Sequence, residues 1–305
     1  MKAVQFDHFG GPEVLELREV ERPVPGPGEV LVAVIATAIN PGEIAIREGL
    51  LEARWPTTFP CGEGSDFAGV VEGRGEDVNG HAVGDEVCGW SDRRASHAEL
   101  VVVPTSQLAP KPASVTWEVA GSLYVAPLAA YASVKAVAPA SGEVVAVSAA
   151  AGGVGSVAVQ LATHAGAKVI GLASEHHHDW LRSKGVIPVT YGEGQGERIL
   201  AAADGRLDAF IDTFGGGYVD LAIELGVAPE RINTIADFPA IERLGVHGDG
   251  TGSVSSVETL LEIAGLVADG ELEIPIERTL PLAEVREAYR ELALRAGRGK
   301  IVLLP

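Results

Sequence analysis

Cysteine, cationic side chains and long hydrophobic runs are all scarce in this sequence, and each shortage excludes a class of protein. Only two cysteines occur in 305 residues, and Cys61 and Cys88 match no metal-ligand spacing, so we expect reduced thiols in a cytoplasmic protein. Lys and Arg number 23 against 42 Asp and Glu, and the net charge of −19 argues against nucleic acid and anionic membranes as partners. No apolar run is long enough to span a bilayer, and the first residues do not resemble a signal peptide.

The remaining composition is typical of a globular protein with two domains. Hydrophobic residues make up 47% of the chain and charged residues 21%. A chain of 305 residues is long enough to build two hydrophobic cores. The 38 glycines indicate tight turns and close packing of helices on strands.

The N-terminal part of the chain has the pattern of many short strands separated by glycine and proline turns. Strands are expected at Lys2–Asp7, Val14–Val20, Glu29–Ala36, before and after the turn at Gly84, and at Ala98–Val103. Many short strands with little helix favour a partly open β-barrel.

The periodicity changes near Thr116. Trp117 to Ala136 has a helical pattern, with Pro127 as the expected break. From Glu143 onward strands alternate with helices, which predicts a parallel sheet. The expected strands are Val144–Val147, Lys168–Ala173, Ile187–Thr190, Leu207–Ile211, Arg231–Ile235 and a sixth at Leu244–His247, and a helix at Ser255–Ala268 closes this part.

After Gly270 the strand pattern returns, with runs at Leu272–Leu280 and Lys300–Leu304 on either side of a helix at Leu282–Arg295. The β-rich domain is therefore predicted to be discontinuous. We expect it to comprise residues 1–120 and 271–305, with residues 121–270 inserted as an α/β domain.

The stretch from Glu143 to Ala165 carries the clearest functional signal. A buried strand leads into a glycine turn and then a helix with apolar residues at helical spacing. Bare N–H groups in such a turn, together with the positive end of the helix, are suited to a diphosphate. The candidate cofactor-binding residues are Ala151, Gly152, Gly153, Val154 and Gly155. The first glycine of the usual fingerprint is Ala150, and a tight turn in any α/β protein is the alternative interpretation.

Several segments, in order along nearly the whole chain, resemble a known family. The matching segments are Asn40-Pro41 with Glu43, Gly64–Val71, Val83–Val87, Tyr131, Ala149–Ala162, Asp212–Gly216 and Gly299–Leu303. They resemble the zinc-free medium-chain dehydrogenases/reductases of the quinone oxidoreductase (zeta-crystallin-like) branch. This resemblance implies an α/β protein: a GroES-like, partly open β-barrel as catalytic domain, plus a Rossmann domain with a doubly wound parallel sheet that binds NADP. It also implies an active site in the cleft between the two domains.

The same resemblance implies that the protein holds no metal. Zinc alcohol dehydrogenases have a Cys where this chain has Asn40 and a His where it has Ser65, and an amide with a hydroxyl does not supply a zinc site. Nothing here corresponds to their four-cysteine lobe. The cluster His176–His178 is interpreted as a solvated surface loop.

The resemblance also bears on the choice of dinucleotide. An NAD-binding Rossmann fold has an acid at the end of its second strand, where this chain has Ser174. Room for a 2′-phosphate favours NADPH, with His176, Arg182 and Tyr191 as candidate contacts. Glu175 would favour NADH if it pointed inward, and Arg182, like Lys184, is also compatible with an ordinary solvated helix face.

The motifs shared with the family add Phe214, Gly215 and Lys300 as further cofactor-binding candidates.

Three residues are candidates for catalysis. Hydride transfer to an activated double bond needs alignment and a donor for the developing oxyanion, and Asn40 or Ser65 could supply that donor. Asn40 is equally compatible with a structural role as a turn opener. Tyr124 is a candidate proton donor, although a helical tyrosine is more often part of a core. The usual family glycine and threonine are replaced by Pro127 and Ala129, so analogy says little about the substrate.

The sequence therefore predicts an NADPH-dependent, zinc-independent reductase of quinones or α,β-unsaturated carbonyls. A reductase of enoyl thioesters and an NADPH-binding sensor without turnover are the alternatives. The expected partners are a small hydrophobic substrate and a second copy of the chain, and the edge near Leu244–His247 is the candidate dimer contact.

Overall fold

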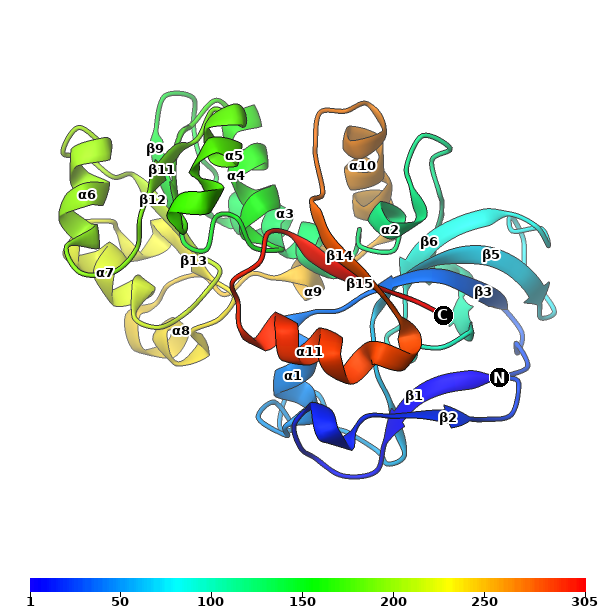
Figure 1. Ribbon diagram of the computed structural model, residues 1–305. Helices are drawn as coiled ribbons and strands as arrows, with labels where there is room; N and C mark the ends of the chain where they lie inside the picture. Colours follow the sequence, from blue (N-terminus) through cyan, green and yellow to red (C-terminus); the bar gives the residue numbers. More distant parts are fainter. The chain divides into compact units, whose positions relative to one another are not determined.

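The chain forms two compact units, and the first is built from both of its ends (Figure 1). The computed structural model describes residues 1–305. Unit 1 comprises Met1–Val125 and Ser256–Pro305, and unit 2 comprises Ala126–Ser255. No helix is both long enough and apolar enough to cross a membrane.

Unit 1 is dominated by antiparallel strand pairs. One sheet has the order β2-β1-β4, and the larger has the order β14-β15-β3-β5-β6-β8 with β7 paired to β3. The strands are β1 Lys2–Phe6, β2 Glu16–Glu19, β3 Glu29–Ala38, β4 Cys61–Gly62, β5 Asp66–Arg74, β6 Glu86–Trp90, β7 Leu100–Pro104, β8 Leu108–Pro110, β14 Ile276–Pro281 and β15 Lys300–Leu304. The helices are α1 Pro41–Arg47, α2 Trp117–Ala120, α10 Val257–Ala268 and α11 Val285–Ala293, with short 3₁₀ turns at Pro12–Val14, Thr105–Gln107 and Leu282–Glu284.

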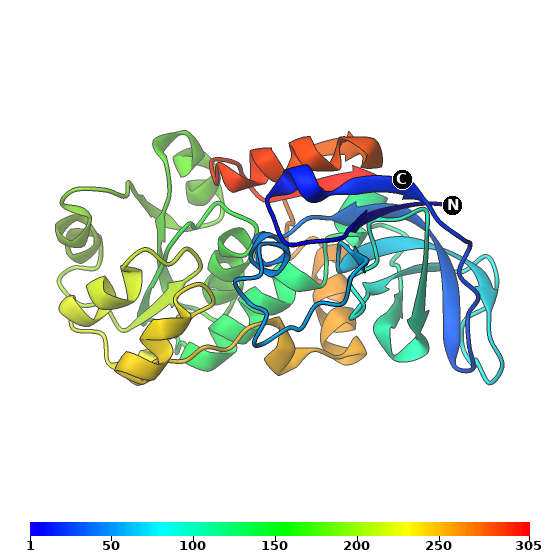
Figure 2. The same cartoon turned by 90° about the horizontal axis from the view of Figure 1, so that it is seen from below.

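The two ends of the chain meet inside unit 1. Helix α11 lies beside the N-terminal strands in both views (Figures 1 and 2). Phe6, Leu15, Tyr289 and Leu303 share one buried cluster, so residues almost 300 positions apart form a single core. A second cluster, which includes Val32, fills the space around strands β3, β5, β6 and β7.

Unit 2 has a five-stranded, fully parallel sheet in the order β11-β10-β9-β12-β13. Its strands are β9 Val144–Val147, β10 Lys168–Leu172, β11 Ile187–Val189, β12 Ala209–Asp212 and β13 Ile232–Thr234. Its helices are α4 Gly155–His164, α5 His178–Ser183, α6 Gln195–Ala202, α7 Tyr218–Glu224, α8 Phe238–Leu244 and α9 Thr251–Val254, with 3₁₀ turns η3 Glu175–His177 and Pro229–Arg231, and α3 Val125–Val137 begins at the unit boundary. The order, in which the first strand lies at the centre, is that of a Rossmann sheet.

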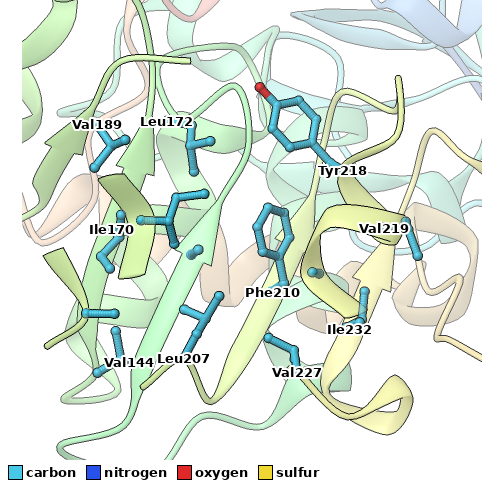
Figure 3. Close-up of a cluster of buried hydrophobic side chains, with 14 of the residues drawn as sticks. Val144, Ile170, Leu172, Val189, Leu207, Phe210, Tyr218, Val219, Val227 and Ile232 are labelled. Atoms are coloured by element: carbon cyan, nitrogen blue, oxygen red, sulfur yellow. The ribbon is translucent and has the colours of Figure 1, made fainter. Parts of the chain in front are cut away.

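Apolar strand residues form the core of unit 2. Val144, Ile170, Phe210 and Ile232 come from four different strands and lie in one buried cluster (Figure 3). Their burial on a parallel sheet explains why these strands read as short, continuous apolar runs in the sequence.

Two predicted elements differ from the structure. The predicted sixth strand is wrong: Leu244 ends helix α8, and only His247 pairs, through a single bridge to Asn233. Gly245, with φ of 69°, ends that helix instead of starting a strand. Pro127 is not a break, because it lies in the first turn of α3, where its missing N–H removes no helical hydrogen bond.

The unit boundaries also differ from those expected at residues 120 and 270. Helix α10 falls in unit 1, whereas its pattern alone placed it with the alternating strands and helices. Ser114 donates a hydrogen bond from Oγ to the carbonyl of Ala268, at 3.4 Å, and this ties the end of α10 to the β-rich unit.

Candidate active site

The glycine turn of unit 2 has the geometry of an anion cradle. Strand β9 ends at Val147, and the chain turns through Ala149, which has φ of 44°, before α4 begins at Gly155. The N–H groups of Val154 and Gly155 have no partner within the chain. They lie in the first turn of a ten-residue helix, whose dipole places partial positive charge there.

Close packing of α4 on this turn requires Gly155. A Cβ on Gly155 would lie 2.1 Å from the carbonyl oxygen of Ala149, far inside van der Waals contact, whereas a Cβ on Gly152 would lie 3.3 Å from the same oxygen. The strand, turn and helix therefore meet as the dinucleotide fingerprint predicts, and the turn fits a diphosphate.

A buried carboxylate organises the neighbouring strand end. Asp212 closes β12 and is fully buried. It accepts hydrogen bonds from Ser148 Oγ at 2.7 Å and Thr234 Oγ1 at 2.8 Å. The N–H groups of Phe214 and Gly215, each 3.0 Å from Oδ1, also donate to it, so Asp212 fixes the turn that carries these two predicted cofactor-binding residues. The sequence analysis included Asp212 only as part of a motif and did not assign it this role. Its position as an acid at the end of an apolar strand was the signal that could have indicated it.

The predicted adenosine contacts lie at the carboxyl ends of β10 and β11. Ser174 Oγ is 3.0 Å from the phenol oxygen of Tyr191, whose side chain is exposed. The exposed ring of His176 lies 3.8 Å from the ring of His177, between centroids. Arg182 is exposed, and its guanidinium is paired with Asp179 at 2.8 Å, as on an ordinary solvated helix face.

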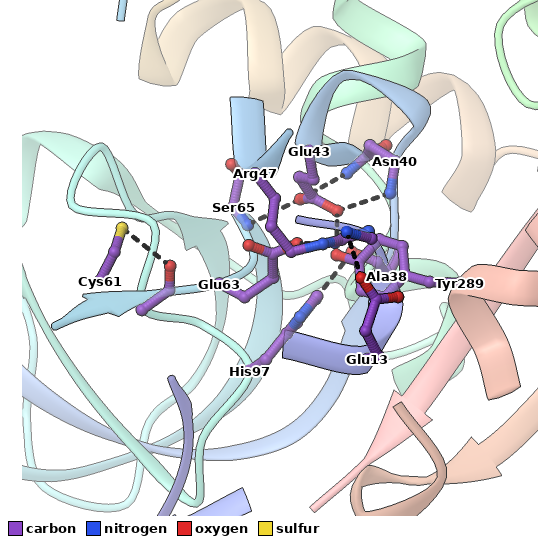
Figure 4. A network of polar contacts seen from close by, with 12 residues as sticks. Glu13, Ala38, Asn40, Glu43, Arg47, Cys61, Glu63, Ser65, His97 and Tyr289 are labelled. Atoms are coloured by element: carbon purple, nitrogen blue, oxygen red, sulfur yellow. Dashed lines mark hydrogen bonds and ion pairs between the residues drawn. The ribbon is translucent and has the colours of Figure 1, made fainter. Parts of the chain in front are cut away.

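In unit 1, Asn40 lies in a buried polar cluster (Figure 4), and the buried Lys300 donates a hydrogen bond to it. Asn40 caps α1 and donates from Nδ2 to Asp66 Oδ2 at 2.7 Å and to Glu43 Oε1 at 3.2 Å. Its Oδ1 accepts from Lys300 Nζ, which also donates to the carbonyl of Ile39 at 2.9 Å.

These bonds bear on two of the predicted roles. The Asn40 amide is only 2% exposed and both of its ends are engaged, so the structure leaves it no free donor for a substrate. Lys300 is 3% exposed, and its ammonium group donates to the carbonyl of Ile39 and to Asn40 Oδ1. Both residues therefore belong to the cluster, and their roles toward substrate and cofactor stay predictions.

Ser65 differs because its side chain is half-buried and its hydroxyl has no partner within the chain. Its position is set by the backbone: the Ser65 N–H donates to Glu43 Oε1 at 3.1 Å, and its carbonyl accepts from Ser91 N at 2.9 Å. Burial is the main cause that raises the pKa of Glu43, while its hydrogen bonds to Tyr289 and Asn40 oppose that rise.

Tyr124 has the character of a core residue. It is 7% exposed, and its ring stacks flat on Trp90 with centroids 4.3 Å apart. The N–H groups of Tyr124 and Val125 both donate to Asp66 Oδ1 at 2.9 Å, so Asp66 caps the start of α3. Burial raises the pKa of the Asp66 carboxyl, with Lys300 opposing it.

The sequence analysis missed the other half of this cluster. Arg47 and Glu63 form an ion pair with side chains 0% and 4% exposed. The Arg47 guanidinium lies over the ring of Tyr289, 4.5 Å from its centroid, and the Tyr289 phenol donates to Glu43 Oε2 at 2.7 Å. His97 lies in the same region, and burial lowers its pKa to about 4. A charged residue in the last turn of a short helix gives no signal of burial in the sequence alone.

No group of three or more His, Cys, Asp or Glu side chains is arranged to hold a metal ion. A reaction without zinc stays a prediction.

Comparison with known proteins finds relatives over the whole chain. Residues 26–113 match the family described as the alcohol dehydrogenase GroES-like domain, and residues 188–303 match the family described as zinc-binding dehydrogenase. A quinone oxidoreductase of Pseudomonas aeruginosa is 30% identical over 331 residues, which cover 100% of this chain and 99% of that protein. The solved quinone oxidoreductase of Coxiella burnetii superposes with a TM-score of 0.90 at 31% identity, covering 100% and 99% of the two chains.

A further relative is part of a much longer protein. The polyketide synthase GfsB of Streptomyces halstedii is 34% identical over 291 residues, which cover 90% of this chain but only 5% of the synthase. These matches confirm the predicted fold, a GroES-like domain joined to a Rossmann domain. The match to a whole quinone oxidoreductase, from one end of the chain to the other, shows that this protein belongs to the quinone oxidoreductase family of medium-chain dehydrogenases/reductases.

Proposed function

We propose that this protein is an NADPH-dependent, zinc-independent oxidoreductase that reduces quinones or α,β-unsaturated carbonyls by hydride transfer. The observation that carries the proposal is the cradle between β9 and α4, where unpartnered N–H groups meet a helix N-terminus. The chain is related over its full length to a quinone oxidoreductase, and this relationship supports hydride transfer as the reaction class.

Residues of unit 2 would hold the cofactor. The amides of Val154 and Gly155 would bind its diphosphate, and the turn held by Asp212 would present Phe214 and Gly215 beside it. Ser174 and Tyr191 offer hydroxyls to a 2′-phosphate, which favours NADPH over NADH. When bound, the reduced nicotinamide supplies the hydride.

In unit 1, Ser65 is the residue to which we assign substrate contact. Its hydroxyl would donate to the carbonyl or quinone oxygen as negative charge develops there. Glu43 positions Ser65 through the backbone N–H. Asn40 donates to both Glu43 and Asp66, and Lys300 donates to Asn40. Overall, a hydride adds to the substrate carbon and a proton from solvent neutralises the oxyanion.

The test is a titration with NADPH and with NADH, followed by oxidation of the bound coenzyme in the presence of 1,4-benzoquinone and of an alkenone. We expect binding of NADPH and turnover with at least one of these electrophiles. Ser65→Ala should lower turnover while coenzyme affinity is unchanged. The control is Ser114→Ala, which removes a hydroxyl that bonds to the end of α10. Binding without turnover on any electrophile would favour the NADPH-binding sensor.

Reduction of enoyl thioesters is the second candidate, because a segment of a polyketide synthase matches 90% of this chain. A short enoyl thioester, with and without coenzyme A as its carrier, distinguishes the two substrates. The net charge of −19 disfavours an anionic carrier, so we expect the simple enone to be reduced faster.

We also propose that the protein is a homodimer, which analytical ultracentrifugation would test by measuring its mass in solution. The edge of the unit 2 sheet at β13 is the candidate contact, with the single bridge of His247 in place of the expected sixth strand.

A further inference from the structure

A buried hydroxyl group without a partner directly follows strand β6 in unit 1. Ser91 is 2% exposed, and its Oγ neither donates nor accepts a hydrogen bond within the chain. Buried polar side chains are nearly always paired, because an unpaired hydroxyl loses its hydrogen bonds to water on folding and gains none in return. The contacts of Ser91 within the fold therefore do not explain why this position carries a hydroxyl.

The pairing of β5 with β6 places Ser91 directly opposite Ser65. The two strands are antiparallel, and Asp66 lies opposite Trp90. The same register continues by one residue, because the Ser91 N–H donates to the carbonyl of Ser65 at 2.9 Å. Residues that face each other in such a pair carry their side chains on the same side of the sheet, with Cβ atoms about 4.5 to 5.5 Å apart. That span is short enough for the two serine hydroxyls to meet in a hydrogen bond of about 2.7 Å.

The neighbouring residues of both strands face the other side of the sheet, toward Tyr124. Asp66 Oδ1 accepts a hydrogen bond from the Tyr124 N–H at 2.9 Å, and the Trp90 ring stacks on the Tyr124 ring. Side chains alternate along a strand, so Ser65 and Ser91 lie on the face away from these contacts. The two serine hydroxyls are therefore each other's nearest candidate partner across the strand pair.

The backbone holds both serines in place while their hydroxyls stay free. The Ser65 N–H donates to Glu43 Oε1 at 3.1 Å (Figure 4), and the Ser91 carbonyl accepts from the Arg94 N–H at 3.0 Å. No hydrogen bond joins the two hydroxyls in this structure, and a rotation about χ1, between the staggered positions of a serine side chain, is enough to form one. Of the two, the half-buried Ser65 can meet a substrate and the buried Ser91 cannot.

From this arrangement we infer that Ser91 is a positioning residue for the proposed reaction, and that its hydroxyl donates to Ser65 Oγ. A serine hydroxyl has one proton and two lone pairs, so Ser65 keeps its proton for the substrate oxygen when it accepts from Ser91. Hydrogen bonds in such a chain polarise one another, which strengthens the bond to an oxygen that gains negative charge. The oxyanion still takes its proton from solvent. The inference rests on the proposed function, which it deepens by adding a residue that acts through Ser65.

The experiment is a double-mutant cycle on Ser65 and Ser91, with NADPH and whichever of 1,4-benzoquinone and the alkenone the wild type reduces. Ser91→Ala should lower kcat about fivefold, the size of one net hydrogen bond, with little change in KM or in the Kd for NADPH. In the Ser65→Ala background the same substitution should change kcat by less than about twofold, because the residue through which Ser91 acts is absent. The urea midpoint of Ser91→Ala should be unchanged or raised, since the substitution removes an unpaired hydroxyl.

Two further variants separate the hydroxyl from its packing. Ser91→Cys fills a similar space with a much weaker donor, so its kcat should be as low as that of Ser91→Ala. Ser122→Ala is the matched control, because Ser122 is a fully buried serine of unit 1 whose hydroxyl donates to the carbonyl of Glu118 at 2.8 Å. It should lower the urea midpoint and leave kcat unchanged.

The outcomes distinguish the inference from the proposed function. A kcat that Ser91→Ala or Ser91→Cys leaves unchanged, or an effect of Ser91→Ala that is equal in both Ser65 backgrounds, would overturn the inference and leave the proposed function standing. A wild type that binds NADPH but reduces neither electrophile would overturn the proposed function, and the inference with it.

Discussion

Removing the guanidinium of Arg47 should expose how unit 1 tolerates its buried charges. Arg47 and Glu63 are almost completely excluded from water, and Tyr289 covers the guanidinium. Arg47→Met keeps the length of the side chain and its packing on the ring but leaves Glu63 buried without its cation. Breaking such a pair costs about 3 to 5 kcal/mol when both of its groups are ionised. Because Arg47 Nε and Nη2 are buried without partners, the wild-type pair is imperfectly satisfied, and we expect the lower end, about 3 kcal/mol.

The cost should depend on pH in a definite direction. Burial raises the pKa of Glu63 from 4.5 to about 8, with the charge of Arg47 opposing the rise. Between these values the folded state holds more protons than the unfolded chain, so this group lowers stability as pH rises. Without Arg47 the pKa of Glu63 rises further. The difference between Arg47→Met and the wild type should therefore be small near about pH 5, where Glu63 is neutral in both, should grow as pH rises through about 8, and should be largest above that pH.

Urea unfolding followed by tryptophan fluorescence measures this difference, because Trp55, Trp90 and Trp117 belong to unit 1 and only Trp180 to unit 2. The double variant Arg47→Met/Glu63→Met removes both charges and should recover most of the lost stability, since an apolar pair of similar volume is often as stable as a buried ion pair. A double variant as unstable as the sum of the two single ones would refute the reasoning, as would a cost for Arg47→Met that is equal at both pH values.

Three further outcomes follow from the structure. Gly155→Ala should destabilise unit 2 by about 1 to 3 kcal/mol in a thermal scan and weaken NADPH binding, because its Cβ would collide with Ala149. In the same scan Gly265→Ala, at an open position of α10, should be neutral or stabilising by up to about 1 kcal/mol. The folded pKa of His97 is about 4 against 6.5 unfolded, so the wild type should lose up to about 3 kcal/mol relative to His97→Asn as pH falls through that interval, as chemical denaturation at each pH would reveal. Ser65→Ala should lower kcat about a hundredfold with little change in the Kd for NADPH, and an unchanged kcat would remove Ser65 from the proposed reaction.

Unit 2 was predictable because its local signals and its tertiary structure agree. The strand at Val144–Val147 has the predicted bounds, and Gly155 lies where helix and strand touch, as the fingerprint requires. The exception is the edge. Leu244 and Val246 have the apolar character of a strand, but the left-handed Gly245 between them ends a helix, and the edge is completed by a single bridge at His247.

Unit 1 shows where such reasoning stops. The sequence drew attention to Asn40, yet its two candidate roles could not be weighed without knowing that Asp66 and Lys300 lie within hydrogen-bond distance. These partners are 26 and 260 residues away in sequence, and no periodicity relates them. Arg47 gave still less warning, because charged residues are rarely buried unless paired, and its partner is known only from the fold.

The two units share one device for holding the loops that the proposed reaction needs. In unit 1, the Glu43 carboxylate collects the N–H groups of Asn40 and Ser65, and in unit 2 Asp212 collects those of Phe214 and Gly215. A buried carboxylate is costly unless donors surround it, and backbone N–H groups can surround it only if the loop adopts one conformation. The cost of burial thus favours one loop conformation, because any other conformation would leave the buried carboxylate without hydrogen-bond donors. Asn40 contributes to this arrangement although its side-chain amide is fully engaged. Its backbone N–H is one of the donors that hold Glu43 in position, and Glu43 in turn holds the backbone of Ser65.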